Sequence, residues 1–180
     1  SVIIQRLIDL HKAKPECSII HSTHYICNSD MKVIRIADYP KALPENTPFL
    51  LLGDGSIHHF ATFKKSSYIK TEGITPIRKK DLAMDQDLYY KLEEVGDVYF
   101  INQPLYYYRI HSGSISNWGN EYKSTNAHYF IIEEACKRRI SKLSKENNAD
   151  AKAMIKKYKT RYHKIRLFSS YRSKEWVLFA

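Results

Sequence analysis

Residues 84–116 constrain the fold more than any other stretch of the chain. Apolar side chains recur there at the spacing of one helix face, at Met84, Leu88, Leu92 and Val95. Gly96 follows, where a helix end favours a left-handed residue. Residues 98–101 and 105–110 are β-branched and aromatic, and the breaker Gln103-Pro104 lies between them. The pattern predicts a helix, a strand, a turn, a second strand and a polar loop.

Four polar residues in this stretch are candidates for chemistry. Asp85 and Asp87 open the helix, where backbone N–H groups and the helix dipole favour a charged carboxylate. Arg109 and His111 are two residues apart at the end of the second strand, so we expect them to share a face. The alternative is structural: Asp85 caps the helix, Asp87 favours its dipole, and the other two are surface side chains.

The order of these features resembles that of a known enzyme family. Asp-Gln-Asp-Leu at 85–88, a helix ending in glycine, a short strand and Leu-x-x-Tyr-Arg-x-His-x-x-Ser-x-Ser at 105–116 resemble the second half of inverting family 2 glycosyltransferases. Upstream, residues 58–65 and 69–73 look like that family's acceptor-side strand and glycine turn. Downstream, residues 132–139 are similar to a helix ending that follows its catalytic domain.

The resemblance implies an α/β fold. Residues 1–140 would form the acceptor-binding half of a GT-A (Rossmann-like) domain, a mixed sheet flanked by helices, and residues 141–180 a basic helical tail. The family's other half holds the nucleotide and carries an Asp-x-Asp metal motif. Residues 85–87 read Asp-Gln-Asp but open a helix, so they do not match that motif. We therefore expect this chain alone to be inactive.

The resemblance also assigns roles to individual residues. Asp85 would be the catalytic base that takes the proton of the attacking hydroxyl. Asp87, Arg109 and His59 would bind substrate, and His111 would add a contact to the metal or the diphosphate. Mg²⁺ or Mn²⁺ would neutralise the leaving diphosphate, with its main ligands outside this chain.

The implied function is inverting transfer of a sugar from a nucleotide-sugar donor to a hydroxyl of a glycan or lipid-linked acceptor, in bacterial surface polysaccharide or glycan synthesis. We expect a cytoplasmic protein, peripheral at the inner face of the cell membrane. Two other classes stay open: a non-catalytic remnant that acts as a scaffold or partner-binding domain, and a nucleic-acid-binding module. An exposed apolar sheet edge would favour self-association.

The charge is concentrated in the tail. Residues 137–174 hold 14 Lys and Arg against two acidic residues, whereas residues 1–136 hold 15 basic and 16 acidic residues. A neutral core argues against specific nucleic-acid binding by the folded face. Residues 151–168 carry an apolar stripe among lysines: Met154, Tyr158, Tyr162 and Ile165. The stripe suits an anionic membrane surface, or packing on the domain or on a second copy.

The remaining segments are predicted from local pattern. We expect helices over 2–13 and 122–140, a strand over 17–27, a hairpin partner over 32–36 and a strand over 56–65. His58 and His59 would then face opposite sides of that strand, as would His21 and His24 of theirs, which argues against a metal site at the latter pair. Residues 40–55 read as a loop, and 75–81 as a basic loop. Three cysteines without a C-x-x-C spacing indicate neither a disulfide framework nor a zinc site.

Overall fold

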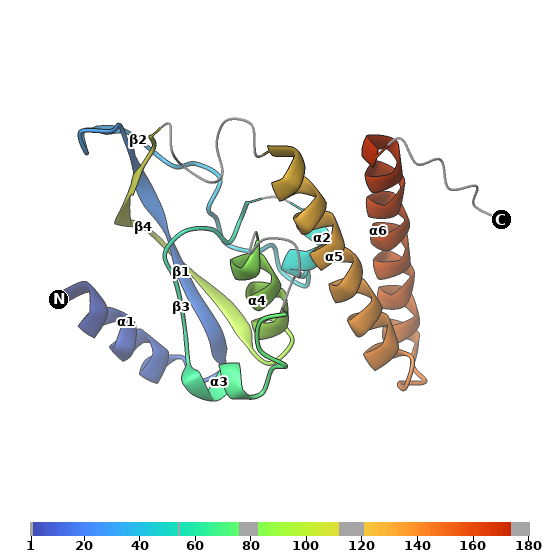
Figure 1. The fold of residues 1–180 in the computed structure, drawn as a ribbon. Coiled ribbons are helices and arrows are strands. Elements are labelled where there is room, and N and C mark those ends of the chain that lie inside the picture. Colours follow the sequence, from blue (N-terminus) through green and yellow to red (C-terminus); the bar gives the residue numbers. More distant parts are fainter. Residues whose placement is uncertain (1, 54, 76–82, 112–120, 174–180) are drawn as a thin grey trace. The chain divides into compact units, whose positions relative to one another are not determined.

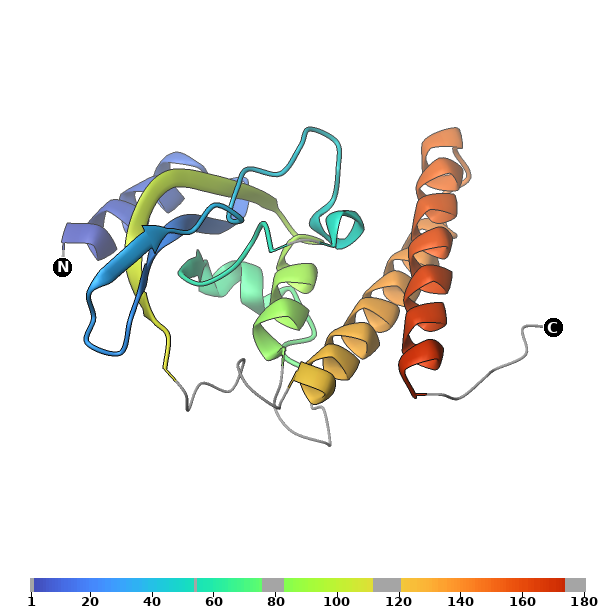
Figure 2. The same ribbon diagram turned by 90° about the horizontal axis from the view of Figure 1, so that it is seen from above.

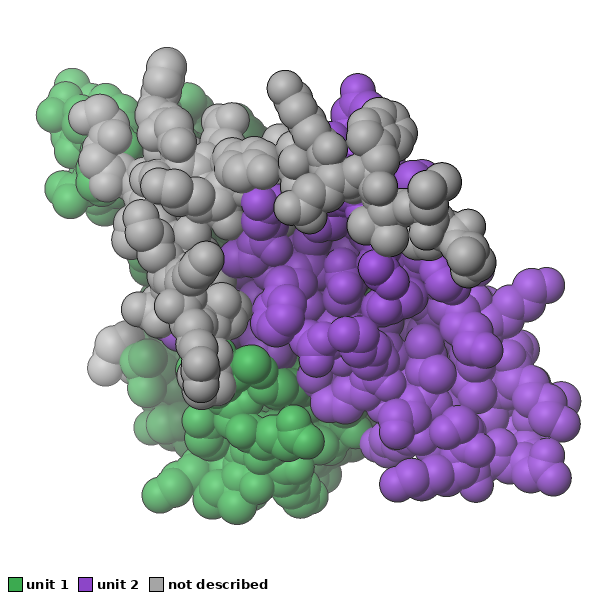
Figure 3. All heavy atoms as spheres, turned by 45° about the vertical axis from the view of Figure 1, so that its right-hand side comes forward, with its two compact units in different colours: residues 1–75, 88–118 green, residues 76–87, 119–180 purple. Residues whose placement is uncertain are grey.

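The computed structural model describes residues 2–53, 55–75, 83–111 and 121–173. The basic loop expected at 75–81 and the polar loop after His111 lie almost wholly outside the described residues. The chain forms two compact units, residues 1–75 with 88–118 and residues 76–87 with 119–180, coloured separately in Figure 3. The elements run in the order α1 (Val2–Ala13), β1 (Cys17–Cys27), β2 (Val33–Ile36), α2 (Phe49–Leu52), β3 (Ala61–Phe63), α3 (Lys65–Ile69), α4 (Met84–Leu92), β4 (Asp97–Arg109), α5 (Glu121–Leu143) and α6 (Ala149–Ser173).

Strand β1 is the centre of the sheet in the first unit (Figure 1). It pairs in parallel with β4 along its whole length, from Cys17 opposite Asp97 to Cys27 opposite Arg109. It also pairs antiparallel with β3 through residues 19–21 and with β2 through residues 25–27. Since a strand has two edges, β3 and β2 share one edge in succession and β4 takes the other. The sheet is therefore mixed, and the expected α/β class is confirmed.

Both faces of β1 are covered. Ile19 and Ile20 point to opposite faces of the strand, and each is 0% exposed. On one face, Leu7 of α1 packs with Ile20 of β1 and Ile101 of β4. Burial on both faces is typical of a strand that pairs in parallel with its neighbour. In β1 it also includes five polar residues: Ser18, His21, Ser22, Thr23 and His24.

The reason for glycine at position 96 differs from the expectation. Gly96 does not have a positive φ, so it is not a left-handed helix cap. A Cβ atom there would lie 2.7 Å from the carbonyl oxygen of Glu16 and 2.9 Å from the Cβ of Ser18. The hydroxyl of Ser18 donates to the carbonyl oxygen of Gly96 at 3.0 Å. Glycine is needed because the chain passes close against β1 as it enters β4.

The turn expected at Gln103-Pro104 is wrong. Residues Asp97–Arg109 form one strand, β4, and Pro104 lies within it. The pairing shifts there, because Ser22 is opposite Ile101 whereas Thr23 is opposite Pro104. Proline cannot donate a ladder hydrogen bond, so it is tolerated at such an irregularity or where the N–H would face away from the partner strand. The register between β1 and β4 therefore shifts at the proline, but the strand continues past it.

The segment 40–55 is more ordered than a plain loop. It contains the single-turn helix α2, whose Phe49 and Leu50 are each 0% exposed. The ring of Phe49 lies 5.3 Å from that of Tyr90, and its backbone N–H donates to the Glu93 carboxylate. Gly53 ends α2 with φ 68°, a left-handed conformation that glycine adopts at little cost. Two buried apolar side chains anchor this segment to the first unit.

The second unit contains an antiparallel helical hairpin of α5 and α6 (Figures 1 and 2). Residues 144–148 separate the two helices, and the break expected at 147–148 lies among them. The Asn148 side chain accepts a hydrogen bond from the N–H of Ala151 at 2.7 Å. This is a helix N-cap. The division expected at residue 140 differs from the division into units, since α5 belongs with α6 and not with the sheet.

Among the described residues, no helix is long and apolar enough to cross a membrane. All three cysteines are buried and unpaired.

Candidate functional site

The two carboxylates at the start of α4 have different surroundings. Asp85 is exposed, and its Oδ1 accepts a hydrogen bond from the N–H of Gln86 at 2.9 Å. Asp87 is 1% exposed, and its N–H donates to the carbonyl oxygen of Ala83. Only Asp85 therefore presents its carboxylate to solvent, and a buried carboxylate such as that of Asp87 is more suited to fixing the helix start.

The charge of Asp85 acts on a histidine of α5. Burial lowers the pKa of His128, and the negative charge of Asp85 partly offsets that effect by raising it. Both residues belong to the second unit. His128 lies some forty positions away in sequence, on another helix, and nothing in the local pattern singles it out. The link between the two residues is electrostatic.

Arg109 and His111 lie at the carboxyl end of β4 in the first unit, and both are exposed. The N–H of Ile110 donates to the carbonyl oxygen of Cys27 at 2.9 Å, so the parallel pairing of β1 and β4 continues to this point. In open α/β sheets, ligands bind outside the carboxyl ends of parallel strands. The two side chains are thus at the edge of the sheet where binding residues are most often found.

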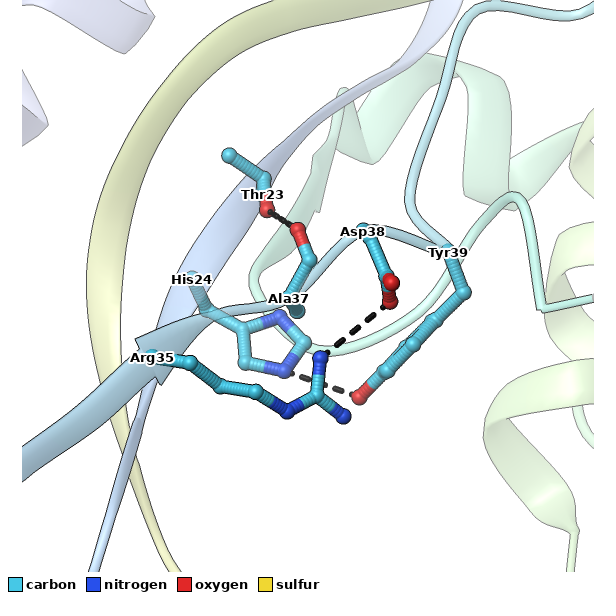
Figure 4. Close-up of polar contacts among 6 residues, drawn as sticks. All are labelled: Thr23, His24, Arg35, Ala37, Asp38 and Tyr39. Carbon is cyan, nitrogen blue, oxygen red and sulfur yellow. Dashed lines mark hydrogen bonds and ion pairs between the residues drawn. The ribbon is translucent and has the colours of Figure 1, made fainter.

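His59 is part of a cluster of rings that the sequence did not predict. We call it the histidine–tyrosine cluster; its members are His24, Tyr39, His58, His59 and Tyr108. The ring of His24, on β1, is fully buried, and its Nε2 forms a 2.9 Å hydrogen bond with the Tyr39 hydroxyl (Figure 4). Next to it, Arg35 forms an ion pair of 3.2 Å with Asp38.

The expectation that His58 and His59 face opposite sides of a strand is wrong. The strand β3 begins only at Ala61, and Phe60 has a φ of 61°, in the left-handed region. Because the regular alternation of a strand is lost, the rings of His58 and His59 touch each other, with centroids 4.0 Å apart. Both also contact His24, at 6.0 and 5.3 Å.

Burial keeps the imidazoles of His24 and His59 neutral. Loss of solvent lowers the pKa of His24 to about 4, with further lowering by His58 and Arg35. Loss of solvent likewise lowers the pKa of His59 to about 3, with further lowering by His58 and His24. At neutral pH such rings have one N–H donor and one nitrogen acceptor, but they do not carry the second proton that would make them positively charged. His59 is therefore a polar contact and not an acid.

The described residues contain no group of three His, Cys, Asp or Glu side chains arranged to hold a metal ion. His21 contacts the ring of Phe100 at 5.0 Å, whereas His24 contacts the histidine–tyrosine cluster. The two histidines thus have separate surroundings, in agreement with the expectation of opposite faces. A metal contact by His111 stays a prediction.

The five residues expected to act together are divided between the units. Asp85 and Asp87 belong to the second unit, and His59, Arg109 and His111 belong to the first. Their convergence at one site stays a prediction. Sequence reasoning missed His24, Tyr39, Tyr108 and His128. The adjacent pair His58-His59 and the Tyr106–Tyr108 run were the only local signals that pointed to a ring cluster. No protein-family model matches the sequence, and no curated protein is detectably similar to it.

Proposed function

We propose that the chain is the acceptor-side half of an inverting GT-A glycosyltransferase. In the complete enzyme it would transfer a sugar from a nucleotide-sugar donor to a hydroxyl of a glycan or lipid-linked acceptor. Asp85 is the base: it takes the proton from the acceptor hydroxyl while the oxygen of that hydroxyl attacks the anomeric carbon. The bond from that carbon to the diphosphate breaks as the new glycosidic bond forms, so the configuration inverts.

The observation that carries the proposal is the contrast between Asp85 and Asp87. Both open α4, yet only the Asp85 carboxylate is exposed and able to meet an acceptor hydroxyl. A base must come within hydrogen-bond reach of the proton that it removes. The negative charge of Asp85 also acts on His128, whose pKa it raises against the larger lowering by burial.

The carboxyl ends of β1 and β4 support the proposal in a second way. Arg109 offers a permanently charged guanidinium at this edge, and the planar fork of arginine matches two oxygens of a phosphate. His111, two residues further on, offers a second polar contact. A diphosphate leaving group gains stabilisation from such groups as its charge develops.

His59 and its surroundings suit the acceptor. The neutral imidazole of His59 stacks on Tyr108, and the neighbouring Phe60 stacks on Tyr106 with centroids 5.9 Å apart. Tyr106 is 40% exposed. Aromatic faces pack against the C–H faces of sugar rings, while a neutral imidazole can hydrogen-bond a hydroxyl.

In the complete enzyme, Mg²⁺ or Mn²⁺ would neutralise the charge of the leaving diphosphate. The described residues do not offer a group of three ligands for such an ion, so they do not fit a complete metal site. We assign no step of the reaction to a metal held by this chain. The metal ligands and the nucleotide pocket would come from the donor-binding half that the family carries upstream.

The test is the Asp85→Asn variant of the complete enzyme, with donor and acceptor saturating and transfer measured by product mass. Turnover should fall by roughly 10²- to 10⁴-fold, because the change removes the proton acceptor and keeps its shape. The donor KM should change little. Asp30→Asn, which removes an exposed carboxylate from the β1–β2 turn, is the matched control and should keep full turnover. Wild-type turnover in Asp85→Asn would rule out the assigned role.

A second candidate is a partner-binding domain without catalysis, and strand β2 favours it. All four residues of β2 are exposed, including Val33 at 49%, Ile34 at 62% and Ile36 at 50%. Exposed apolar edge strands pair readily with other chains. Light scattering during gel filtration distinguishes the cases: self-association that Ile34→Lys abolishes, with turnover absent from the complete protein, would favour the second candidate.

A further inference from the structure

Helix α6 has two chemically different faces, and the structure assigns the first of them to α5. Ala151, Tyr158 and Ile165, seven residues apart in succession, are each 3% exposed. The guanidinium of Arg139 on α5 donates to the Tyr158 hydroxyl at 3.1 Å and lies 5.6 Å from the centre of its ring. The apolar stripe seen in the sequence is therefore used to join the two helices and is not available to a membrane.

The surface of α6 outside this buried stripe is cationic. Its exposed lysines are Lys152, Lys156, Lys157, Lys159 and Lys164. The sequence contains no acidic residue between positions 151 and 173. On an ordinary solvated helix, charges of both signs alternate along the exposed face. A long face of one sign is an electrostatic surface for a polyanion.

The last turns of the same helix expose large apolar side chains. Leu167 is 56% exposed, Phe168 43% and Tyr171 70%. The ammonium group of Lys164 lies 5.8 Å from the centre of the Phe168 ring. At 100° per residue, Leu167 and Tyr171 lie on the side opposite Tyr158, the same side as Lys156 and Lys164. Cations and apolar groups therefore share one face.

This combination decides between possible partners. In a dimer formed through this face, the lysines of one copy would lie against the lysines of the other, and like-charge repulsion opposes that contact. A nucleic acid accounts for the lysines, but it offers no apolar interior for an aliphatic side chain such as Leu167. The surface of an anionic bilayer accounts for both, because lysines meet the phosphates while apolar side chains enter the acyl boundary.

We infer that the outward face of α6, formed by these five lysines with Leu167, Phe168 and Tyr171, binds the surface of a bilayer that contains anionic phospholipid. The helix lies on the membrane with its α5-facing side turned away. This inference goes beyond the proposed function and does not depend on it, since the helical hairpin alone supplies the binding groups.

The experiment is vesicle flotation of the full chain at 50 mM and 500 mM NaCl. Vesicles of phosphatidylcholine with 30% phosphatidylglycerol should carry the protein at low salt, and pure phosphatidylcholine should not. High salt should weaken the binding because it screens the lysines. The triple change Lys152→Gln, Lys156→Gln and Lys159→Gln should lower the partition coefficient by roughly a hundredfold.

A matched triple change controls for net charge. Lys32→Gln, Lys65→Gln and Lys70→Gln remove the same charge from exposed positions of the first unit and should leave most of the binding. Leu167→Ser with Phe168→Ser should weaken binding while every lysine remains. Circular dichroism confirms that each variant is folded. Equal loss in the two triple variants, or no effect of the serine changes, would overturn the inference. So would tighter binding to duplex DNA or RNA than to anionic vesicles.

Discussion

The imidazole ring of His59 stacks on the phenol ring of Tyr108, with their centroids 4.0 Å apart and the ring planes 25° from parallel. This contact joins the irregular segment before β3 to the far part of β4. It also shields part of His59 from water, and this loss of solvent is the main reason for the low pKa of His59. Buried neutral histidines of this kind link the stability of the first unit to pH.

We expect the first unit to lose stability as the pH falls below about 6.5. Burial lowers the folded-state pKa of His21 and of His24 to about 4, from 6.5 in the unfolded chain. The unfolded chain therefore binds protons first, so the full stability is present above pH 6.5 and is lost progressively toward pH 4. For His21 the loss at pH 5 is about 2 kcal/mol. Urea unfolding at pH 7.5, 6 and 5 measures it.

His21→Phe should reduce this pH dependence by the share of His21, while His24 still contributes, since the change keeps a ring against Phe100 and removes one proton site. His111→Phe, at an exposed histidine, should leave the dependence unchanged. Identical unfolding free energies from pH 7.5 to 5 in the unmodified chain would contradict the assignment.

Gly96→Ala should destabilise the first unit by about 1 to 3 kcal/mol. The added Cβ would meet the backbone oxygen of Glu16 at 2.7 Å, and a backbone atom paired into the sheet cannot move aside cheaply. Gly55→Ala is the comparison, because the nearest atom there, 3.2 Å away, is in the Tyr39 side chain. Urea unfolding should show a larger decrease in the free energy of unfolding for Gly96→Ala than for Gly55→Ala. The reverse order would contradict the close contact between residue 96 and Glu16 as the reason for glycine.

Changes at the two carboxylates of α4 should differ in their effect on the free energy of unfolding. Asp87→Asn should lower the free energy of unfolding by about 1 to 3 kcal/mol, since it alters a buried polar group that is 1% exposed. Asp85→Asn should change it by less than about 0.5 kcal/mol, as exposed sites usually do. Thermal unfolding of the two variants measures this difference. A destabilised Asp85→Asn with a neutral Asp87→Asn would reverse the proposed roles.

Tyr158→Phe should destabilise the helical hairpin by about 1 to 3 kcal/mol. It removes the hydroxyl that accepts from the guanidinium of Arg139, a residue only 7% exposed. Tyr171→Phe removes a hydroxyl from a ring that is 70% exposed and should have little effect. The circular dichroism signal at 222 nm in a urea titration measures the free energy of unfolding of both variants. Equal stability of Tyr158→Phe and Tyr171→Phe would argue against the buried hydrogen bond.

The chain by itself should bind nucleotide-sugar donors no more tightly than about millimolar. Asp85, Arg109 and His111 can supply a base and a few polar contacts, which is too little to immobilise a flexible, hydrated dianion. Calorimetric titration with UDP- and GDP-sugars in the presence of Mn²⁺ tests this. Micromolar affinity would mean that this chain holds a donor site of its own and that the family assignment needs revision.

Some elements follow from local sequence alone. Helix α1 occupies the expected residues 2–13, and β1 occupies the expected residues 17–27. Strand β2 covers residues 33–36 of the expected 32–36. The periodicity of apolar residues that predicts a helix or a strand extends over a few residues, so it can be recognised within the segment itself. The break at residues 147–148 is equally local, since an asparagine side chain caps the next helix itself.

Other features depend on residues far apart in sequence. Gly96 is required by Glu16 and Ser18, about eighty positions earlier, and not by the helix that it follows. Pro104 stays within β4 because β1 pairs on both sides of it through a shift in register. His59 meets Tyr108 only after the chain turns at Phe60.

The sequence by itself determined the helix α1, the strands β1 and β2 and the region where the positive charge gathers, because these depend on neighbours within a few positions. The tertiary structure alone decided which carboxylate of α4 is exposed, which histidines lose their water, and which face of α6 remains open once Tyr158 packs on α5. Burial is set by contacts between distant segments, and such contacts leave no periodic trace in the local sequence.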